Sequence, residues 1–88
     1  MSKYNKMTDA ALWGACVVES ESQATDIETL CIDLLNEWDG TWQMGRNADK
    51  KSYWCELFLS DSTFPATSTS IPRAVCIAWL MAKDAEKK

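Results

Sequence analysis

The chain has 88 residues, which corresponds to one domain with a small core. Hydrophobic residues make up 47% of it and the formal net charge is −4, so its composition excludes a disordered protein. It contains no histidine, which removes the commonest general base and the commonest metal ligand and argues against an enzyme.

The first element we expect is a short helix after a polar start. Residues 1–6, MSKYNK, predict a flexible tail. Thr8 is a suitable N-cap with Asp9 in the first turn, so a helix is predicted from about Asp9 to Val18. The polar segment 19–24 then breaks the pattern.

The segment 25–40, TDIETLCIDLLNEWDG, has the strongest helical pattern in the chain. Thr25 and Glu28 have the spacing of a capping box. Gly40 is expected to end the helix as a left-handed cap. One apolar stripe runs along the helix at helical spacing and predicts a core-facing side: Ile27, Leu30, Cys31, Leu34, Leu35 and Trp38.

Three short segments follow that predict an antiparallel meander of strands. They are 41–46, 52–60 and 63–70, with turns at 47–51 and 61–62. Pro65 favours an edge position for the third strand. In the second strand both sides are mostly apolar, so the side that carries Trp54 and Phe58 is either covered or a binding surface.

The closing segment SIPRAVCIAWLMAKDAEKK predicts a helix that lies on this sheet. Ser70 is a good N-cap and Pro72 fits the first turn. The predicted fold is therefore α+β, a three-stranded antiparallel sheet with helices packed on it, in the order α-α-β-β-β-α.

Three of these segments together resemble a known family. TDIETLCIDLLNEW, the aromatic strand SYWCELFL and ATSTSIPRAVCIAWLMA are similar to the phage ABA sandwich domain, and the closing segment is similar to NinX-like phage proteins. The resemblance covers roughly residues 25–82. It implies a bacteriophage origin, a small α+β sandwich and a role in phage–host conflict, and it brings no catalytic residues with it.

The four cysteines are best interpreted as buried, reduced core residues. Cys16, Cys31, Cys55 and Cys76 stand among apolar neighbours at long, irregular spacings, so a zinc site is not expected. Two disulfides are the alternative. The segment MSKYNKM lacks the apolar stretch of a secretory signal, and no apolar run approaches the roughly 20 residues that span a bilayer. We expect a location in the cytoplasm of a host bacterial cell.

The charge is distributed unevenly along the chain. Between residues 7 and 45 there are eight acids and no Lys or Arg, whereas residues 46–88 hold seven bases and five acids. An acidic surface of this kind repels nucleic acid and attracts basic protein surfaces. An ordinary solubilising charge is the simpler interpretation. If the surface is functional, the residues expected to bind a partner are Glu19, Glu21, Asp26, Asp33 and Glu37.

These observations favour a function by binding rather than by catalysis. We expect a small non-enzymatic accessory protein, with no cofactor or metal, that binds and inhibits or modulates a host protein, for example as an anti-CRISPR inhibitor of a nucleic-acid-binding defence complex. Trp54 and Phe58 are expected to form an apolar contact with that target or with a second copy of the chain. The alternative is a nucleic-acid-binding module, because the last five elements have the order found in double-stranded-RNA-binding domains. A small carboxylate enzyme is the least favoured interpretation.

Overall fold

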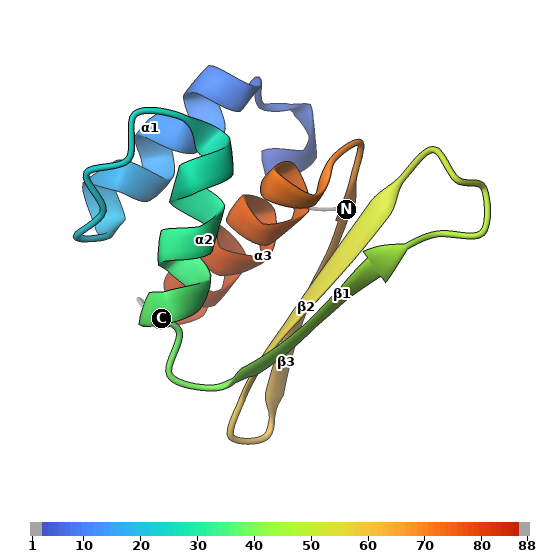
Figure 1. Cartoon of the computed structure of the whole chain (residues 1–88). Helices are drawn as coiled ribbons and strands as arrows, with labels where there is room; N and C mark the ends of the chain where they lie inside the picture. Colours follow the sequence, from blue (N-terminus) through green and yellow to red (C-terminus); the bar gives the residue numbers. More distant parts are fainter. Residues whose placement is uncertain (1–2, 87–88) are drawn as a thin grey trace.

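Three helices lie on one side of a three-stranded antiparallel sheet (Figure 1). The computed structural model describes residues 3–86. The sheet order is β1-β2-β3, so the predicted α+β architecture and its element order are confirmed. The elements in chain order are a 3-10 helix η1 (Lys3–Lys6), α1 (Asp9–Glu19), α2 (Ile27–Glu37), β1 (Thr41–Arg46), β2 (Tyr53–Leu59), β3 (Ser62–Ser68) and α3 (Ile71–Glu86).

Two of the three helices begin where their capping residues predict. The Thr8 hydroxyl accepts a hydrogen bond from the Ala11 amide at 3.1 Å and starts α1. The Ser70 hydroxyl accepts from the Arg73 amide at 3.3 Å and starts α3. A single polar side chain therefore satisfies one of the free amides at each of these helix ends.

Both predicted ends of α2 are wrong in detail. Asp26, not Thr25, is the N-cap, and its carboxylate accepts a hydrogen bond from the Thr29 amide at 2.7 Å. The helix closes at Trp38, whose amide donates to the Leu35 carbonyl. No glycine among residues 3–86 has a positive φ, so Gly40 is not a left-handed cap. Gly40 is needed for space, since a Cβ there would lie 1.7 Å from the Phe58 carbonyl oxygen.

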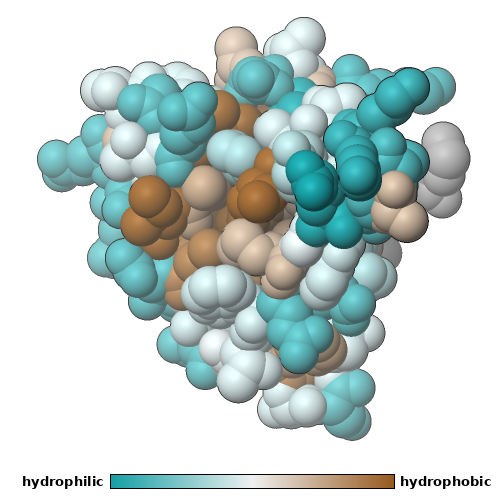
Figure 2. Space-filling view, turned by 45° about the vertical axis from the view of Figure 1, so that its right-hand side comes forward, coloured by the Kyte–Doolittle hydropathy of each residue, from teal (hydrophilic) through white to brown (hydrophobic). Residues whose placement is uncertain are grey.

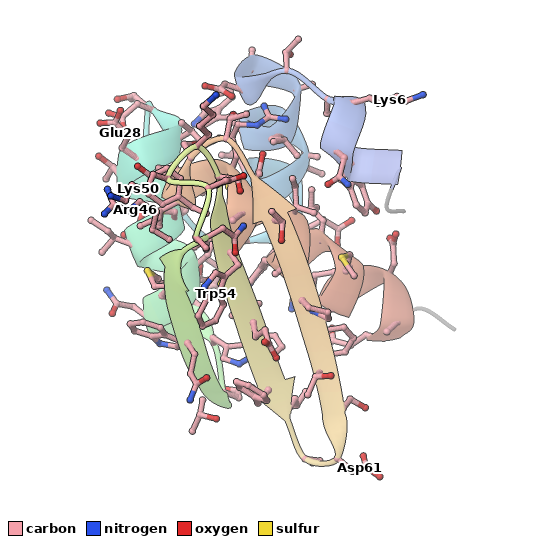
Figure 3. All side chains as sticks on the ribbon, turned by 90° about the vertical axis from the view of Figure 1, so that its right-hand side faces the viewer. Lys6, Glu28, Arg46, Lys50, Trp54 and Asp61 are labelled. Carbon is pink, nitrogen blue, oxygen red and sulfur yellow. The ribbon has the colours of Figure 1, made fainter. Side chains whose placement is uncertain are left out.

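The pleat of the sheet separates a buried side from an open side. Cys55 and Leu57 of β2 face the helices and are fully buried, and α3 packs across β2 and β3. The side chains that alternate with them in β2 lie on the face that no helix covers (Figure 3). The β2–β3 turn falls at residues 60–61, one position before the predicted turn, with Ser60 in the left-handed region at φ 54°.

The segment from residue 3 to residue 6 is part of the fold and not a flexible tail. Residues 3–6 form η1, and Tyr4 within it is only 8% exposed. The Tyr4 hydroxyl donates a hydrogen bond to the Asp84 carboxylate near the end of α3. Burial, together with this carboxylate, raises the pKa of Tyr4 to about 12. The predicted tail is thus wrong for residues 3–6, and residues 1–2 lie outside the described residues.

The core gathers one cysteine from each of four elements. Cys16 of α1, Cys31 of α2, Cys55 of β2 and Cys76 of α3 are all buried free thiols, as predicted. The Cys16 thiol lies 3.8 Å from the Cys76 carbonyl oxygen. Burial raises the pKa of Cys31 to about 11 and that of Cys55 to about 12. The thiols of Cys31 and Cys55 are therefore neutral packing groups at physiological pH.

Candidate interaction surface

The segment between α1 and α2 folds back onto α2 and is held there by two of the predicted acidic residues. The Ser22 hydroxyl donates to Asp33 Oδ2 at 2.6 Å. The Glu21 amide donates to Glu37 Oε1 at 3.3 Å. Asp33 and Glu37 therefore hold the segment between α1 and α2 against the helix in addition to carrying surface charge, and we call them the bracing residues. The helical pattern alone did not reveal this role.

Asp26 does not belong to the same surface as the other predicted acids. It lies at the opposite end of α2 from Glu37, about 16 Å away along the helix axis by the rise per residue. Its carboxylate is occupied by the Thr29 amide, and this hydrogen bond lowers the pKa of Asp26 below its ordinary value. Its place at the helix N-terminus makes it a capping residue.

The other end of α2 borders a pocket of about 240 Å³. Three of its lining acids were predicted, Glu19, Glu21 and Glu37, whereas Asp39 and Glu86 were not. The remaining lining residues are Ser20, Trp38, Leu59, Trp79 and Lys83. We call the five carboxylates and the two indoles around it the acidic pocket. Four chain segments contribute to it, namely residues 19–21 at the end of α1, residues 37–39 at the end of α2, the end of β2 and the second half of α3.

The acidic pocket already holds one cation against an aromatic wall. The Lys83 ammonium lies 4.9 Å from the centre of the Trp79 ring and 3.5 Å from Glu86 Oε2. Trp79 is only 3% exposed, and the Trp38 indole N–H is committed to the carbonyls of Thr41 and Phe58, each at 3.1 Å. Both indoles are therefore fixed, Trp38 on the core-facing stripe that the sequence predicts, and the wall is preformed.

The open face of the sheet is a second surface, and it is more polar than predicted. Trp54 and Phe58 lie on it, but both are half-buried. A Cβ on Gly45 would lie 2.8 Å from the Trp54 indole nitrogen, so the Trp54 ring lies directly over Gly45. The residues in register on this face are Thr41, Gln43, Gly45, Trp54, Glu56, Phe58, Thr63, Pro65 and Thr67. The two aromatic rings are thus separated by Glu56 and bordered by threonines.

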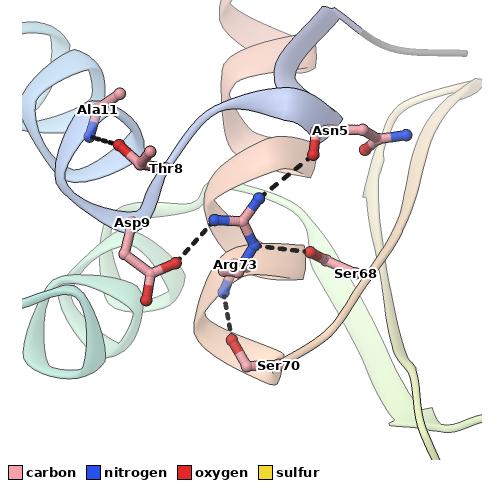
Figure 4. Close-up of polar contacts among 7 residues, drawn as sticks. All are labelled: Asn5, Thr8, Asp9, Ala11, Ser68, Ser70 and Arg73. Carbon is pink, nitrogen blue, oxygen red and sulfur yellow. Dashed lines mark hydrogen bonds and ion pairs between the residues drawn. The ribbon is translucent and has the colours of Figure 1, made fainter.

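The only base at the start of α3 is engaged within the fold (Figure 4). The Arg73 guanidinium pairs with Asp9 at 2.7 Å, and its Nε donates to the Ser68 hydroxyl at 2.9 Å. A third bond reaches the Asn5 carbonyl at 3.3 Å. Arg73 is 12% exposed and ties η1, α1 and β3 to α3. It is therefore a structural residue at the place where double-stranded-RNA-binding domains present lysines.

Residues 3–86 contain no group of three or more Cys, Asp or Glu side chains arranged to hold a metal ion. Within the same range, no helix has both the length and the apolar character needed to cross a bilayer.

Comparisons with protein-family models, with curated proteins and with solved structures find no match to this chain. The similarity to the phage ABA sandwich domain therefore remains a prediction from the sequence.

Proposed function

We propose that this chain is a small binding protein that recognises a basic surface of a partner protein through its acidic pocket. The observation that carries the proposal is the convergence of Glu19, Glu21, Glu37, Asp39 and Glu86 on one pocket with a preformed aromatic wall. Carboxylates gathered from three chain segments, 19–21, 37–39 and the end of α3, produce a negative potential that steers and orients a basic partner.

The size of the pocket indicates what it takes up. At about 240 Å³ it lies below the roughly 300–1,000 Å³ typical of small-molecule sites. It suits the end of one long side chain, such as an arginine or a lysine of the partner. Lys83 already lies over the Trp79 ring and beside Glu86, so a cation of the partner would bind next to it, among the remaining carboxylates.

The finer proposal is that the protein is phage-encoded and inhibits a nucleic-acid-binding host defence complex. Such complexes hold nucleic acid in basic grooves, and an acidic protein surface competes for the same cations. This accounts for a chain with eight acids and no base between residues 7 and 45. The protein would act in the host cytoplasm without a cofactor.

Affinity capture with charge-reversed variants tests the proposal. Glu21→Lys with Glu86→Lys reverses two exposed charges of the acidic pocket and leaves the bracing residues Asp33 and Glu37 in place. Glu28→Lys with Asp61→Lys is the matched control, since it changes the net charge equally at exposed positions outside the pocket.

We expect the wild type and the control to capture the same basic protein from bacterial lysate, and the pocket variant to lose it. Added salt should weaken the capture, because screening reduces attraction between exposed charges. Equal capture by all three proteins would exclude the acidic pocket as the contact. A salt-dependent gel shift of double-stranded RNA by the wild type would favour the nucleic-acid-binding alternative instead.

A further inference from the structure

The two free edges of the sheet differ in the backbone groups that they expose. The β1–β2 turn determines which residues of β1 turn their N–H and C=O groups outwards. The Asn47 amide donates to the Ser52 carbonyl at 2.9 Å, so the pair 47–52 is a hydrogen-bonded pair of the β1–β2 ladder. Such pairs recur at every second residue of an antiparallel ladder. Gly45, Gln43 and Thr41 therefore turn their backbone groups towards β2. Three residues turn theirs outwards at the free edge of β1: Trp42, Met44 and Arg46.

The free edge of β3 is blocked, whereas the free edge of β1 is open. In the β2–β3 hairpin Leu59 pairs with Ser62 across a two-residue turn, so the backbone groups of Thr63, Pro65 and Thr67 point outwards. Pro65 has no N–H to offer at that edge, which is a common protection of edge strands. β1 has no proline and no bulge in its register with β2. It is thus a template for another strand.

Exposed apolar side chains lie beside the open edge of β1. Figure 2 shows apolar side chains gathered in a hollow between α2 and β1. Ile32 of α2 is 59% exposed and Trp42 of β1 is 44% exposed, and they are two of the three large apolar side chains exposed among residues 3–86. The helices pack mainly on β2, β3 and one another, so β1 extends beyond the cover that α3 provides. A strand added at β1 would cover part of this hollow.

The charges at the two ends of β1 are complementary to each other. Glu37 and Asp39 precede the strand, and Arg46, Lys50 and Lys51 end or follow it. Asp49 lies among these bases, but its carboxylate accepts bonds from the Lys51 and Ser52 amides within the same turn. An antiparallel partner with the same sequence would place its basic end beside the acidic end of this strand, and the reverse at the other end.

We propose that the occupant of the β1 edge is a second copy of this chain, paired antiparallel to form a continuous six-stranded sheet. Even-numbered residues of β1 must lie opposite even-numbered residues of β1 in the second copy, because a shift by one residue would place side chains on the wrong face of the sheet. Placing Met44 opposite Met44 of the second copy pairs all three outward residues, and it sets Trp42 opposite Arg46 of the second copy. That cross-strand pair joins an exposed indole to an exposed guanidinium.

A proline substitution at the centre of the edge tests the dimer in purified protein. Met44→Pro removes the central outward N–H, and Met44→Ala is the control that loses the same side chain but keeps the amide. By sedimentation equilibrium we expect the wild type and Met44→Ala to dimerise. Met44→Pro should raise the dissociation constant about tenfold or more, since two symmetry-related hydrogen bonds are lost. Circular dichroism checks that both variants fold.

A charge exchange keeps the proposal testable if the proline variant does not fold. Asp39→Lys alone and Lys50→Glu alone should each weaken the dimer, and the two together should restore it, because each end then meets its opposite again. A wild type that stays monomeric at every concentration would overturn the proposal. So would a Met44→Pro variant that dimerises as well as Met44→Ala. The dimer uses Glu37 and Asp39 of the acidic pocket, so the capture test of the pocket is made with Glu21 and Glu86, which lie away from the β1 edge, and the two proposals can fail separately.

Discussion

At the scale of single residues, Gly14 and Gly40 have opposite roles although both are glycines next to core elements. A Cβ at Gly40 would lie 1.7 Å from the Phe58 carbonyl oxygen and 2.9 Å from its carbon, whereas one at Gly14 meets nothing within 4 Å. We expect Gly40→Ala to lower the free energy of unfolding by about 1–3 kcal/mol, since backbone atoms must move. Gly14→Ala should raise it by about 0.5–1 kcal/mol, because Gly14 is in the middle of α1.

Urea unfolding followed by tryptophan fluorescence measures both values. The two substitutions add the same methyl group. If they change the free energy of unfolding in opposite directions, a general effect of replacing glycine by alanine is excluded. A Gly40→Ala variant as stable as the wild type would mean that the chain between α2 and β1 does not pass this close to β2.

At the scale of elements, the start of α2 distinguishes two adjacent capping residues. The Asp26 carboxylate accepts the Thr29 amide, whereas Thr25 is exposed and outside the helix. We expect Asp26→Ala to lower the melting temperature and Thr25→Ala to leave it unchanged within error. The folded pKa of Asp26 is lowered, so the capping contribution is present above its ordinary pKa of 3.8 and is lost as the pH falls through the lower folded value.

Thermal melts of the two variants at pH 7 and at acid pH check this. The difference between the wild type and Asp26→Ala should shrink at acid pH. If Thr25→Ala is the damaging change, the helix starts one residue earlier than the structure has it.

The same element shows how far sequence reasoning reaches. The periodic stripe of α2 predicted its buried residues Leu30, Cys31 and Leu34 because helical spacing is a local property. The sequence alone did not distinguish Thr25 from Asp26 as the N-cap of α2, because both side chains can accept a hydrogen bond from an amide in the first turn of the helix. The path of the preceding loop determines which of the two caps the helix. The β2–β3 turn was misplaced by one residue for a similar reason, since Ser60, Asp61 and Ser62 are all turn formers.

The candidate site was only partly predictable because it is made by tertiary contacts. Glu19, Glu21 and Glu37 were found from the charge distribution along the chain. Asp39 and Glu86 lie far apart in sequence and come to line one pocket only when the end of α3 packs near the residues that follow α2. The partnership of Arg73 with Asp9, 64 residues away, is equally invisible to local patterns. No regular spacing in the sequence links such residues, and only the packing of the helices shows that they are neighbours.

At the scale of the whole molecule, the buried thiol of Cys31 and the hydroxyl of Tyr4 make stability sensitive to alkaline pH. Their folded pKa values are raised, for Cys31 from 9.0 to about 11 and for Tyr4 from 10.0 to about 12, by burial first of all. The unfolded chain loses these protons earlier than the folded one. The stability contribution is therefore complete below pH 9 and is lost progressively as the pH rises from about 9 towards 12.

Urea unfolding at a series of pH values under reducing conditions measures this loss. We expect the free energy of unfolding to be flat between pH 7 and 8 and to fall above pH 9. Cys31→Ala should fall less steeply between pH 9 and 11, and Tyr4→Phe should differ from the wild type less at pH 12 than at pH 8. Because Cys16, Cys31, Cys55 and Cys76 come from four elements that meet in one core, none should react with a thiol reagent at pH 8 until the protein unfolds. Rapid labelling of a folded thiol at that pH, or a wild-type stability that does not change up to pH 11, would show that the elements do not close around these thiols as a single core.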